Sequence, residues 1–254
     1  VDVAIYDEDY AVQVGVSGIG LVSRNDGRVL DKQNPSRGYS VDSNGDLIVM
    51  GSRTQRVSLW RFQEPEQLSP AGFIDGQGVH EKVAVSTDVI AVAWREQGLK
   101  LYGTNTENTV LTQISATDVY AVDICGEALF YSDASELVWV SITDPSNPLE
   151  QQRIPLDSEI RDIECNDDYV ALGLGGNGVQ VFERQTQLVS VGTDEPPGSV
   201  FSVSLDGDML WAASWSQTIL YTLGDGLQSI AHESPVSAAM AVAASGGRAI
   251  VADW

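Results

Sequence analysis

Hydrophobic and polar positions along the chain form short strand-like runs rather than helical stripes. The segment 160–199 shows this most clearly. It contains an apolar run ending at Cys165, a polar turn, the run 169–174, a glycine-rich break, and further runs at 179–182 and 188–191. Short apolar runs bounded by Gly, Asn and Asp are typical of β-hairpins. Because no stretch has a period of 3.6, we predict four strands in this segment and almost no helix in the chain.

The four-strand pattern recurs about every forty residues. Its first strand carries one aligned valine or isoleucine in each copy: Val3, Val41, Val83, Val122, Ile163, Val203 and Val242. A four-stranded sheet with two apolar faces must stack on neighbouring copies, and this period is typical of propeller blades. We therefore predict a single all-β domain over 1–254, a β-propeller of four-stranded antiparallel blades. Its approximate repeats are 1–37, 38–78, 79–118, 119–159, 160–199, 200–238 and a partial 239–254.

The seventh repeat contains only two strand-like runs before Trp254. Seven repeat starts favour seven blades with the last incomplete, and six blades with an appended hairpin is the alternative. The chain begins at Val1 without a methionine, so we expect a piece of a longer protein. Residues after Trp254, or a strand from a partner chain, would then pair with the open edge of the seventh blade.

Two segments resemble the repeats of LVIVD-type propellers. They are VWVSITDPSNPLEQQRIPL at 138–156 and GVQVFERQTQLVSVGTDEPPG at 178–198. In that family an Asp-Pro-x-x-Pro turn follows the third strand; the second, third and sixth repeats of this chain lack it. The resemblance covers the whole chain as architecture and carries no catalytic motif. It implies a binding or surface role.

Charge and composition limit the classes of partner that we expect this protein to bind. The formal net charge is -22 and the isoelectric point is near 4.1, which disfavours nucleic acid and anionic membranes. No apolar run approaches the roughly eighteen residues of a membrane helix, so we expect no membrane insertion. Lysine is scarce and carboxylates are abundant, which suits a saline or extracellular setting. We expect an extracytoplasmic protein that is secreted, periplasmic or on the cell surface.

Cys125 and Cys165 lie one repeat apart, at or beside the ends of first strands in neighbouring blades. A disulfide between them is one interpretation, and two separate buried thiols are the other.

Catalytic motifs are sparse. His80 and His232 fall near fourth-to-first connections of well-separated repeats, and the zinc-protease and nucleophile-elbow motifs are absent from the sequence. The run Gly173–Gly178 matches a dinucleotide motif, but a strand-like run follows it where a helix would be needed. We expect a non-enzymatic module without a cofactor. The alternative is a lyase or hydrolase that uses the central opening, with His80, Arg95, Arg161 and His232 as its candidates.

Tryptophans and acidic residues near the loops are the candidate binding residues. Trp94, Trp215 and Trp254 fall at equivalent ends of second strands, on the face that carries His80 and His232. Exposed tryptophans there would contact a protein or carbohydrate partner, whereas buried ones would wedge between blades. Acidic first-to-second turns offer oxygen ligands for calcium, although Asp, Asn and Gly are also what tight hairpins need.

Overall fold

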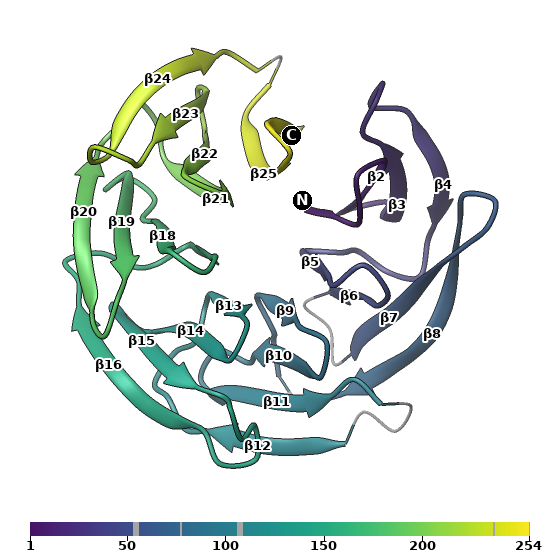
Figure 1. Ribbon diagram of the computed structural model, residues 1–254. Helices are drawn as coiled ribbons and strands as arrows, with labels where there is room; N and C mark the ends of the chain where they lie inside the picture. The colour runs from purple at the N-terminus through teal and green to yellow at the C-terminus, as the bar shows by residue number, and fades with distance from the viewer. Residues whose placement is uncertain (53–55, 77, 106–108, 236, 254) are drawn as a thin grey trace.

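The structure is a ring of β-sheets around one axis (Figure 1). The computed structural model describes residues 1–52, 56–76, 78–105, 109–235 and 237–253. Every regular element in these ranges is a strand. Within each sheet consecutive strands pair antiparallel, so successive strands move outward from the axis.

The strands of the first three blades follow in chain order. Blade 1 contains β1 (Asp2–Ile5), β2 (Tyr10–Gly15), β3 (Gly18–Ser23) and β4 (Val29–Gln33). Blade 2 contains β5 (Ser40–Ser43), β6 (Ile48–Gly51), β7 (Arg56–Gln63) and β8 (Gln67–Asp75). Blade 3 contains β9 (Val83–Val85), β10 (Val89–Ala93), β11 (Leu99–Gly103) and β12 (Val110–Ile114).

The remaining strands complete the ring. Blade 4 contains β13 (Val122–Cys125), β14 (Ala128–Asp133), β15 (Glu136–Ser141) and β16 (Leu149–Pro155). Blade 5 contains β17 (Asp162–Cys165), β18 (Tyr169–Gly173), β19 (Val179–Arg184) and β20 (Leu188–Asp194). Blade 6 contains β21 (Val200–Asp206), β22 (Met209–Ser214), β23 (Thr218–Thr222) and β24 (Gln228–Glu233). A hairpin of β25 (Ala239–Ser245) and β26 (Arg248–Asp253) follows.

The propeller therefore has six complete blades and one hairpin, which is the alternative reading of the sequence. The prediction of seven blades is corrected, because the last sheet contains only two strands. Its inner strand β25 nevertheless occupies a place in the ring, in contact with β21 on one side and β1 on the other. The seven aligned valine and isoleucine residues all lie in inner strands and line the axial cavity, as predicted.

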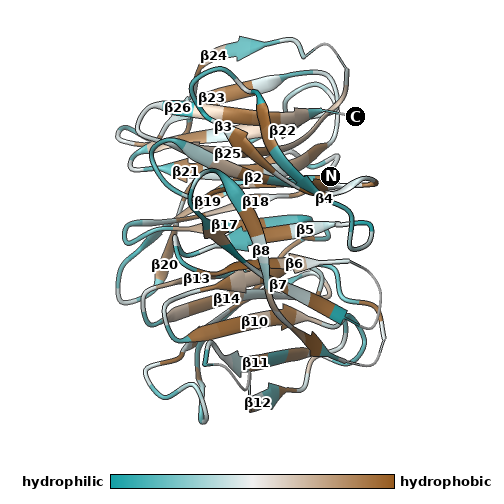
Figure 2. Cartoon of the chain, turned by 90° about the vertical axis from the view of Figure 1, so that its right-hand side faces the viewer, coloured by the Kyte–Doolittle hydropathy of each residue, from teal (hydrophilic) through white to brown (hydrophobic). Residues whose placement is uncertain are grey.

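Hydrophobic side chains fill the spaces between blades, and the outer strands face solvent. β10 is buried along its whole length, whereas every residue of β24 is exposed. Figure 2 shows the same contrast in hydropathy between these two strands. Most inner and middle strands are covered on both faces by neighbouring blades, which explains why these strands have continuous runs of apolar residues.

Side-chain oxygens join the inner strands of adjacent blades. The inner edges belong to separate sheets, so their N–H groups need another acceptor. Asp2 Oδ2 accepts from Val41 N at 3.1 Å, and Ser40 Oγ accepts from Val83 N at 3.0 Å. The same link recurs from Asp42 to Val85, Asp123 to Cys165, Asp162 to Val203, Ser202 to Val242 and Ser204 to Ala244. Many acidic residues of the inner strands thus connect blades.

Two arginines link the hairpin to blade 1. Arg24 Nη2 donates to Ser245 O at 2.5 Å, and Arg248 Nη1 donates to Asn25 Oδ1 at 3.2 Å. Between the hairpin and blade 1, small residues of the hairpin such as Ala241 and Ala243 make the contacts nearest the axis.

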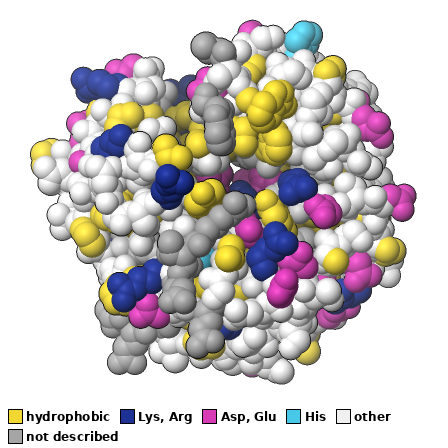
Figure 3. Space-filling model, turned by 180° about the vertical axis from the view of Figure 1, so that it is seen from behind, with side chains coloured by type: hydrophobic (Ala, Val, Ile, Leu, Met, Phe, Trp, Pro, Cys, Tyr) yellow, Lys and Arg dark blue, Asp and Glu magenta, His cyan; other side chains and the backbone are white. Residues whose placement is uncertain are grey.

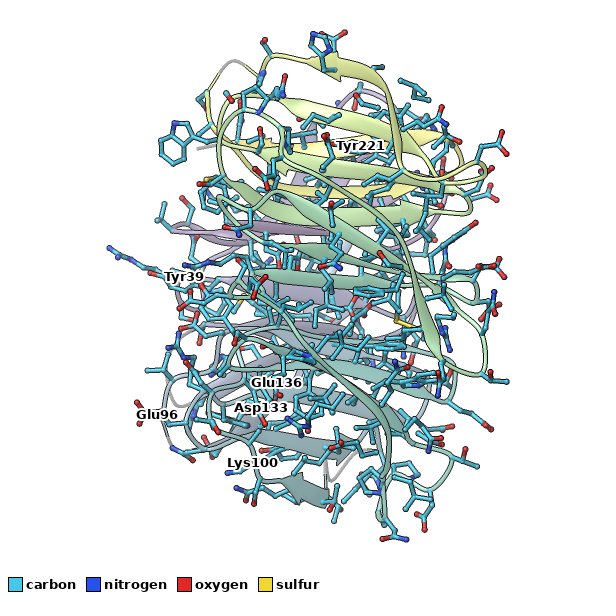
Figure 4. The ribbon with its side chains drawn as sticks, turned by 90° about the vertical axis from the view of Figure 1, so that its left-hand side faces the viewer. Tyr39, Glu96, Lys100, Asp133, Glu136 and Tyr221 are labelled. Atoms are coloured by element: carbon cyan, nitrogen blue, oxygen red, sulfur yellow. A yellow bond between two sulfur atoms is a disulfide. The ribbon has the colours of Figure 1, made fainter. Side chains whose placement is uncertain are left out.

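Outer strands are held by polar contacts. In β16, Arg153 Nη1 binds Asp133 at 2.9 Å and Glu136 at 2.6 Å, two carboxylates that lie side by side at the β14–β15 turn (Figure 4). The Tyr221 hydroxyl donates to Asp194 Oδ2 at 2.8 Å and so joins blade 6 to blade 5.

Candidate functional site

The two faces of the ring carry different connections. Because strands alternate in direction, the second-to-third and fourth-to-first connections share one face, which we call the rear face after its view in Figure 3. That view shows charged and hydrophobic side chains around a hollow at the axis. The axial cavity holds about 200 Å³ and is lined by the inner strands.

Lys82 lies in this cavity, near its rear end, and binds two carboxylates from other blades. Its Nζ atom is 3.2 Å from Asp2 Oδ2 and 2.9 Å from Asp162 Oδ1. Both aspartates are almost completely buried. Burial opposes the charge of Lys82, but the fields of Asp162 and Asp2 outweigh it and raise its pKa. The three residues therefore form a charged link across the axis.

A second layer of the cavity contains three carboxylates from Asp42, Asp123 and Glu164. Burial raises the pKa of Asp42 to about 6, despite hydrogen bonds from the backbone of Val85 and Ser43. Burial, followed by repulsion from neighbouring carboxylates, raises the pKa of Asp123 and of Glu164 well above their ordinary values. The cavity thus concentrates negative charge that one lysine only partly balances.

This layer predicts an unusual pH dependence of stability. A carboxyl whose pKa is higher in the folded state binds more protons when folded, so its ionisation destabilises the fold as pH rises through the folded pKa. We expect Glu164→Gln to raise the free energy of unfolding by about 1 kcal/mol or more at pH 8. At pH 4.5, where Glu164 is protonated, the gain should vanish.

Urea denaturation at several pH values measures the effect. Glu195→Gln, which neutralises an exposed glutamate of the β20–β21 connection, controls for the loss of overall negative charge. An equal gain from both variants would mean that the layer has no special role.

A pocket of about 410 Å³ lies on the rear face, between blades 3, 4 and 5. Tyr120, just before β13, forms its centre. The guanidinium carbon of Arg95 lies 5.2 Å from the centroid of the Tyr120 ring, and that of Arg161 lies 5.3 Å from it. Both are within cation–π range. We call Arg95, Tyr120 and Arg161 the rim cluster.

Carboxylates orient the two arginines. Arg95 binds Asp118 through Nε at 2.7 Å and Nη2 at 3.0 Å, and lies 3.5 Å from Glu81. Arg161 Nη2 lies 2.8 Å from Glu159, whose side chain is largely exposed. These groups offer charged donors, acceptors and an aromatic ring to a ligand. The contacts of the two arginines with carboxylates are ion pairs, and they do not form a nucleophile–base pair.

The backbone at Arg95 is uncommon for an arginine. Its φ is 52°, in the left-handed region, and the same place in blade 5 holds Gly175 with φ 60°. Both residues form the same isolated bridge to the next blade, Arg95 with Val119 and Gly175 with Val200. A non-glycine residue there costs about 1–2 kcal/mol. Ala134, at the matching position of blade 4, has the same φ of 52°. The guanidinium therefore distinguishes blade 3 at this position.

The histidines named from the sequence do not meet in the described part of the chain. His80 is fully buried in the β8–β9 connection, where its Nε2 accepts from Ser52 N at 2.7 Å and its ring contacts Trp94 edge-on at 5.1 Å. His232 is exposed on β24, the outer strand of blade 6. Of the four enzymatic candidates, only Arg95 and Arg161 converge.

The tryptophan prediction is corrected for Trp94. It is 1% exposed, and its ring lies so close to Gly76 that a Cβ there would come within 1.9 Å of it. Trp94 therefore wedges between blades 2 and 3. Trp215, at the equivalent end of β22, is 55% exposed and contacts Phe201 with ring centroids 6.0 Å apart. Trp254 lies outside the described residues.

The structure joins Cys125 and Cys165 in a disulfide, with Cα atoms 5.9 Å apart, at the ends of β13 and β17.

The acidic and amide residues of the first-to-second turns stabilise these turns. Asp7, Asn44 and Asn166 each accept hydrogen bonds from two following backbone N–H groups. Among the described residues, no group of three or more His, Cys, Asp or Glu is placed to hold a metal ion.

Repeat alignment contained a signal that our sequence analysis did not use. Lys82 is the one cation at a position filled elsewhere by Asp, Ser or Ala. This departure marks the axial cavity.

No family model matches the chain, and no curated protein matches it. Solved structures do. The β-propeller domain of Cps50 (Swd1) from Myceliophteria thermophila superposes with a TM-score of 0.77 at 11% identity, covering 92% of this chain and 85% of that one. U3-55K gives 0.76 at 15% identity, covering 96% and 84%. These similarities show a β-propeller fold.

The comparison also corrects the expected location. Both similar structures come from intracellular proteins, so the prediction of a secreted, periplasmic or cell-surface protein is withdrawn. No helix long and apolar enough to cross a membrane occurs in the described ranges.

Proposed function

We propose that this chain is a non-enzymatic propeller module that binds a protein partner on its rear face. The observation that carries the proposal is Arg95, held in a left-handed conformation where blade 5 has glycine, with its guanidinium against Tyr120. The conformation costs stability, and the position gains a charged, aromatic-backed contact group at the surface.

The size of the face supports a macromolecular partner. The rim cluster lies on blades 3 to 5, whereas the exposed Trp215 and its neighbour Phe201 lie on blade 6. A ligand that contacts both must extend over several neighbouring blades, as a protein surface does. Arginine and tryptophan are also the residues that most often dominate binding energy at protein interfaces.

Electrostatics supports a partner with basic groups. The chain carries a net charge of -22, and the rim cluster is bordered by Glu159 and Asp118. A cationic partner surface is attracted by this field, and its association rate should fall as salt is added.

The LVIVD-type assignment is a further proposal of ours; the turn that begins at Asp144 between β15 and β16 supports it.

Arg95→Gly separates binding from stability. Glycine relieves the left-handed strain, so the midpoint of urea denaturation should stay the same or rise. Capture of partner proteins from native extract, quantified by mass spectrometry, should fall at least tenfold for the same set of proteins. Trp215→Ala should reduce that set too.

Arg61→Ala is the matched control. Arg61 is a half-exposed arginine paired with Asp46 away from the rear face. Captured proteins that persist equally in all three variants would reject the rear face as the contact surface. A large loss of stability in Arg95→Gly would instead make Arg95 a structural residue.

A further inference from the structure

The Cys125–Cys165 disulfide lies towards the face of the ring opposite the rear face. The two cysteines end β13 and β17, and the first-to-second turns that follow them carry exposed residues such as Gly126 and Asp167. Both cysteines are themselves partly exposed. Figure 4 draws their sulfur–sulfur bond in yellow. The bond therefore ties blade 4 to blade 5 beside solvent, away from the rim cluster.

Arg184 brings a guanidinium to one sulfur of this disulfide. It ends β19 in blade 5, and its Nη1 atom lies 3.0 Å from Cys125 Sγ in blade 4. The same Nη1 atom donates to the carbonyl of Asn166. The guanidinium carbon lies 5.4 Å from the centroid of the Phe130 ring, within cation–π range. These contacts hold the cation between the two blades, beside Cys125.

Arg184 lacks a carboxylate bound to its guanidinium in the described part of the chain. Burial lowers the pKa of Arg184, and the fields of Asp167, Asp168 and Asp123 oppose that effect without a hydrogen bond to it. Its Nε atom is buried and has no hydrogen-bond partner among the described residues. A buried donor without an acceptor costs stability. A negative charge on Cys125 would give this guanidinium a partner.

The same position in blade 1 shows how such an arginine links blades where no sulfur is present. Arg24 follows β3, and both Arg24 and Arg184 donate Nη1 to a carbonyl of the turn that precedes their second strand. Arg24 Nη2 donates to the carbonyl of Ser245, which ends the inner strand of the hairpin as Cys125 ends that of blade 4. The two arginines make the same kind of blade link, but only the sulfur can become an anion.

We propose that the Cys125–Cys165 disulfide is a reversible thiol switch in which Arg184 stabilises Cys125 as the departing thiolate. The reductant is a dithiol. One of its thiolates forms a bond to Cys165 Sγ, the bond between the two cysteines breaks, and Cys125 keeps the electron pair.

The second thiolate of the reagent completes the exchange. It attacks the reagent sulfur bound to Cys165, which releases Cys165 as a thiolate. Both protons of the dithiol go to water, Cys165 recovers one, and Cys125 remains a thiolate. The two cysteines gain the two electrons that the reagent loses as it becomes a disulfide. A small disulfide in solution reverses the exchange.

Arg184 determines which sulfur leaves. An adjacent arginine lowers the pKa of a thiol, and a thiol of lower pKa leaves faster. Asp123 favours the same direction, because its Oδ2 atom accepts from Cys165 N at 2.7 Å and its charge disfavours a thiolate on Cys165. The other acidic groups on the elements around the disulfide are Glu127, Glu164, Asp167, Asp168 and Glu183.

Reduced glutathione identifies the sulfur that is attacked. The folded, oxidised chain is treated with it at pH 7, quenched with N-ethylmaleimide and digested for mass spectrometry. We expect glutathione on Cys165 and maleimide on Cys125, at least tenfold above the reverse pattern. The proposal is overturned by equal amounts, by an excess of the reverse pattern, or by a disulfide that thiols open only in urea.

Variants test the role of the guanidinium. Arg184→Met should slow reduction by dithiothreitol at least fivefold, and Arg184→Lys should restore part of the rate. Arg24→Met is the matched control, because it removes the same kind of blade link without a sulfur, and it should leave the rate unchanged. Lost packing alone would expose the disulfide and speed its reduction. Unchanged or faster reduction of Arg184→Met, or equal slowing in Arg24→Met, therefore overturns the proposal.

Hydrogen exchange shows whether the bond acts as a switch. The disulfide joins residues 40 positions apart, so reduction removes a constraint on the inner strands of blades 4 and 5. Segments 122–125 and 162–165 should exchange faster in the reduced chain, and glutathione disulfide should restore both the bond and the slow exchange. Identical exchange in the two forms would leave the disulfide without a switching role. Partner capture on the rear face is not involved, so this proposal fails or stands independently of the proposed function.

Discussion

Replacing Lys82 with methionine is expected to lower the free energy of unfolding by about 3–5 kcal/mol at pH 7, because it leaves two buried carboxylates without their cation. Asp2 and Asp162 would then face each other across the axial cavity, beside Asp42, Asp123 and Glu164. The lysine links blades 1, 3 and 5, so the loss affects the whole ring. Urea denaturation followed by tryptophan fluorescence measures it.

The pH dependence of this variant tests the cause. Burial raises the pKa of Asp162, so this carboxylate takes up a proton as the solution is acidified and the cost of Lys82→Met should shrink. Adding Asp162→Asn should restore part of the stability at pH 7, since asparagine still offers an oxygen to Val203 N. Lys32→Met, on the exposed outer strand of blade 1, should change stability by less than about 0.5 kcal/mol. A cost that is independent of pH would point to lost packing of the lysine stem instead.

Replacing Trp94 with alanine is expected to cost about 3–5 kcal/mol of unfolding free energy, the usual effect of emptying a buried aromatic site. The indole fills the space between blades 2 and 3, against His80 and Gly76. Trp215→Ala, just after β22 in blade 6, should cost less than about 1 kcal/mol, since that ring is mostly in solvent.

The pair of tryptophan variants separates packing from binding. Trp94→Ala should lower the denaturation midpoint, and partner capture should survive at temperatures where the variant is folded. Trp215→Ala should keep the midpoint and lose capture. If both variants unfold at the same reduced urea concentration, Trp215 would be a structural wedge like Trp94, and the rear-face proposal would lose one of its contacts.

The sequence by itself determined the architecture. Strand lengths, turn residues and the forty-residue period follow from local physics, because a four-stranded sheet needs apolar residues on both faces and Gly, Asn or Asp in its turns. The inner valines and the neighbouring position of the two cysteines follow from the period alone. The count of complete blades also depended on the sequence, which supplies only two strands in the last repeat.

Only the tertiary structure decided which of the repeated positions are buried, charged or available. Trp94 and Trp215 both follow the second strand of their blades, but they are one residue apart in register, because Trp94 aligns with the buried Ser214. The loop that carries Gly76 and His80 covers Trp94, whereas Trp215 is 55% exposed. Lys82, Asp2 and Asp162 meet across the axis from three separate blades, and Arg95 and Arg161 meet at Tyr120 from two. Closing the ring brings these residues together, and no local pattern along the chain encodes that closure.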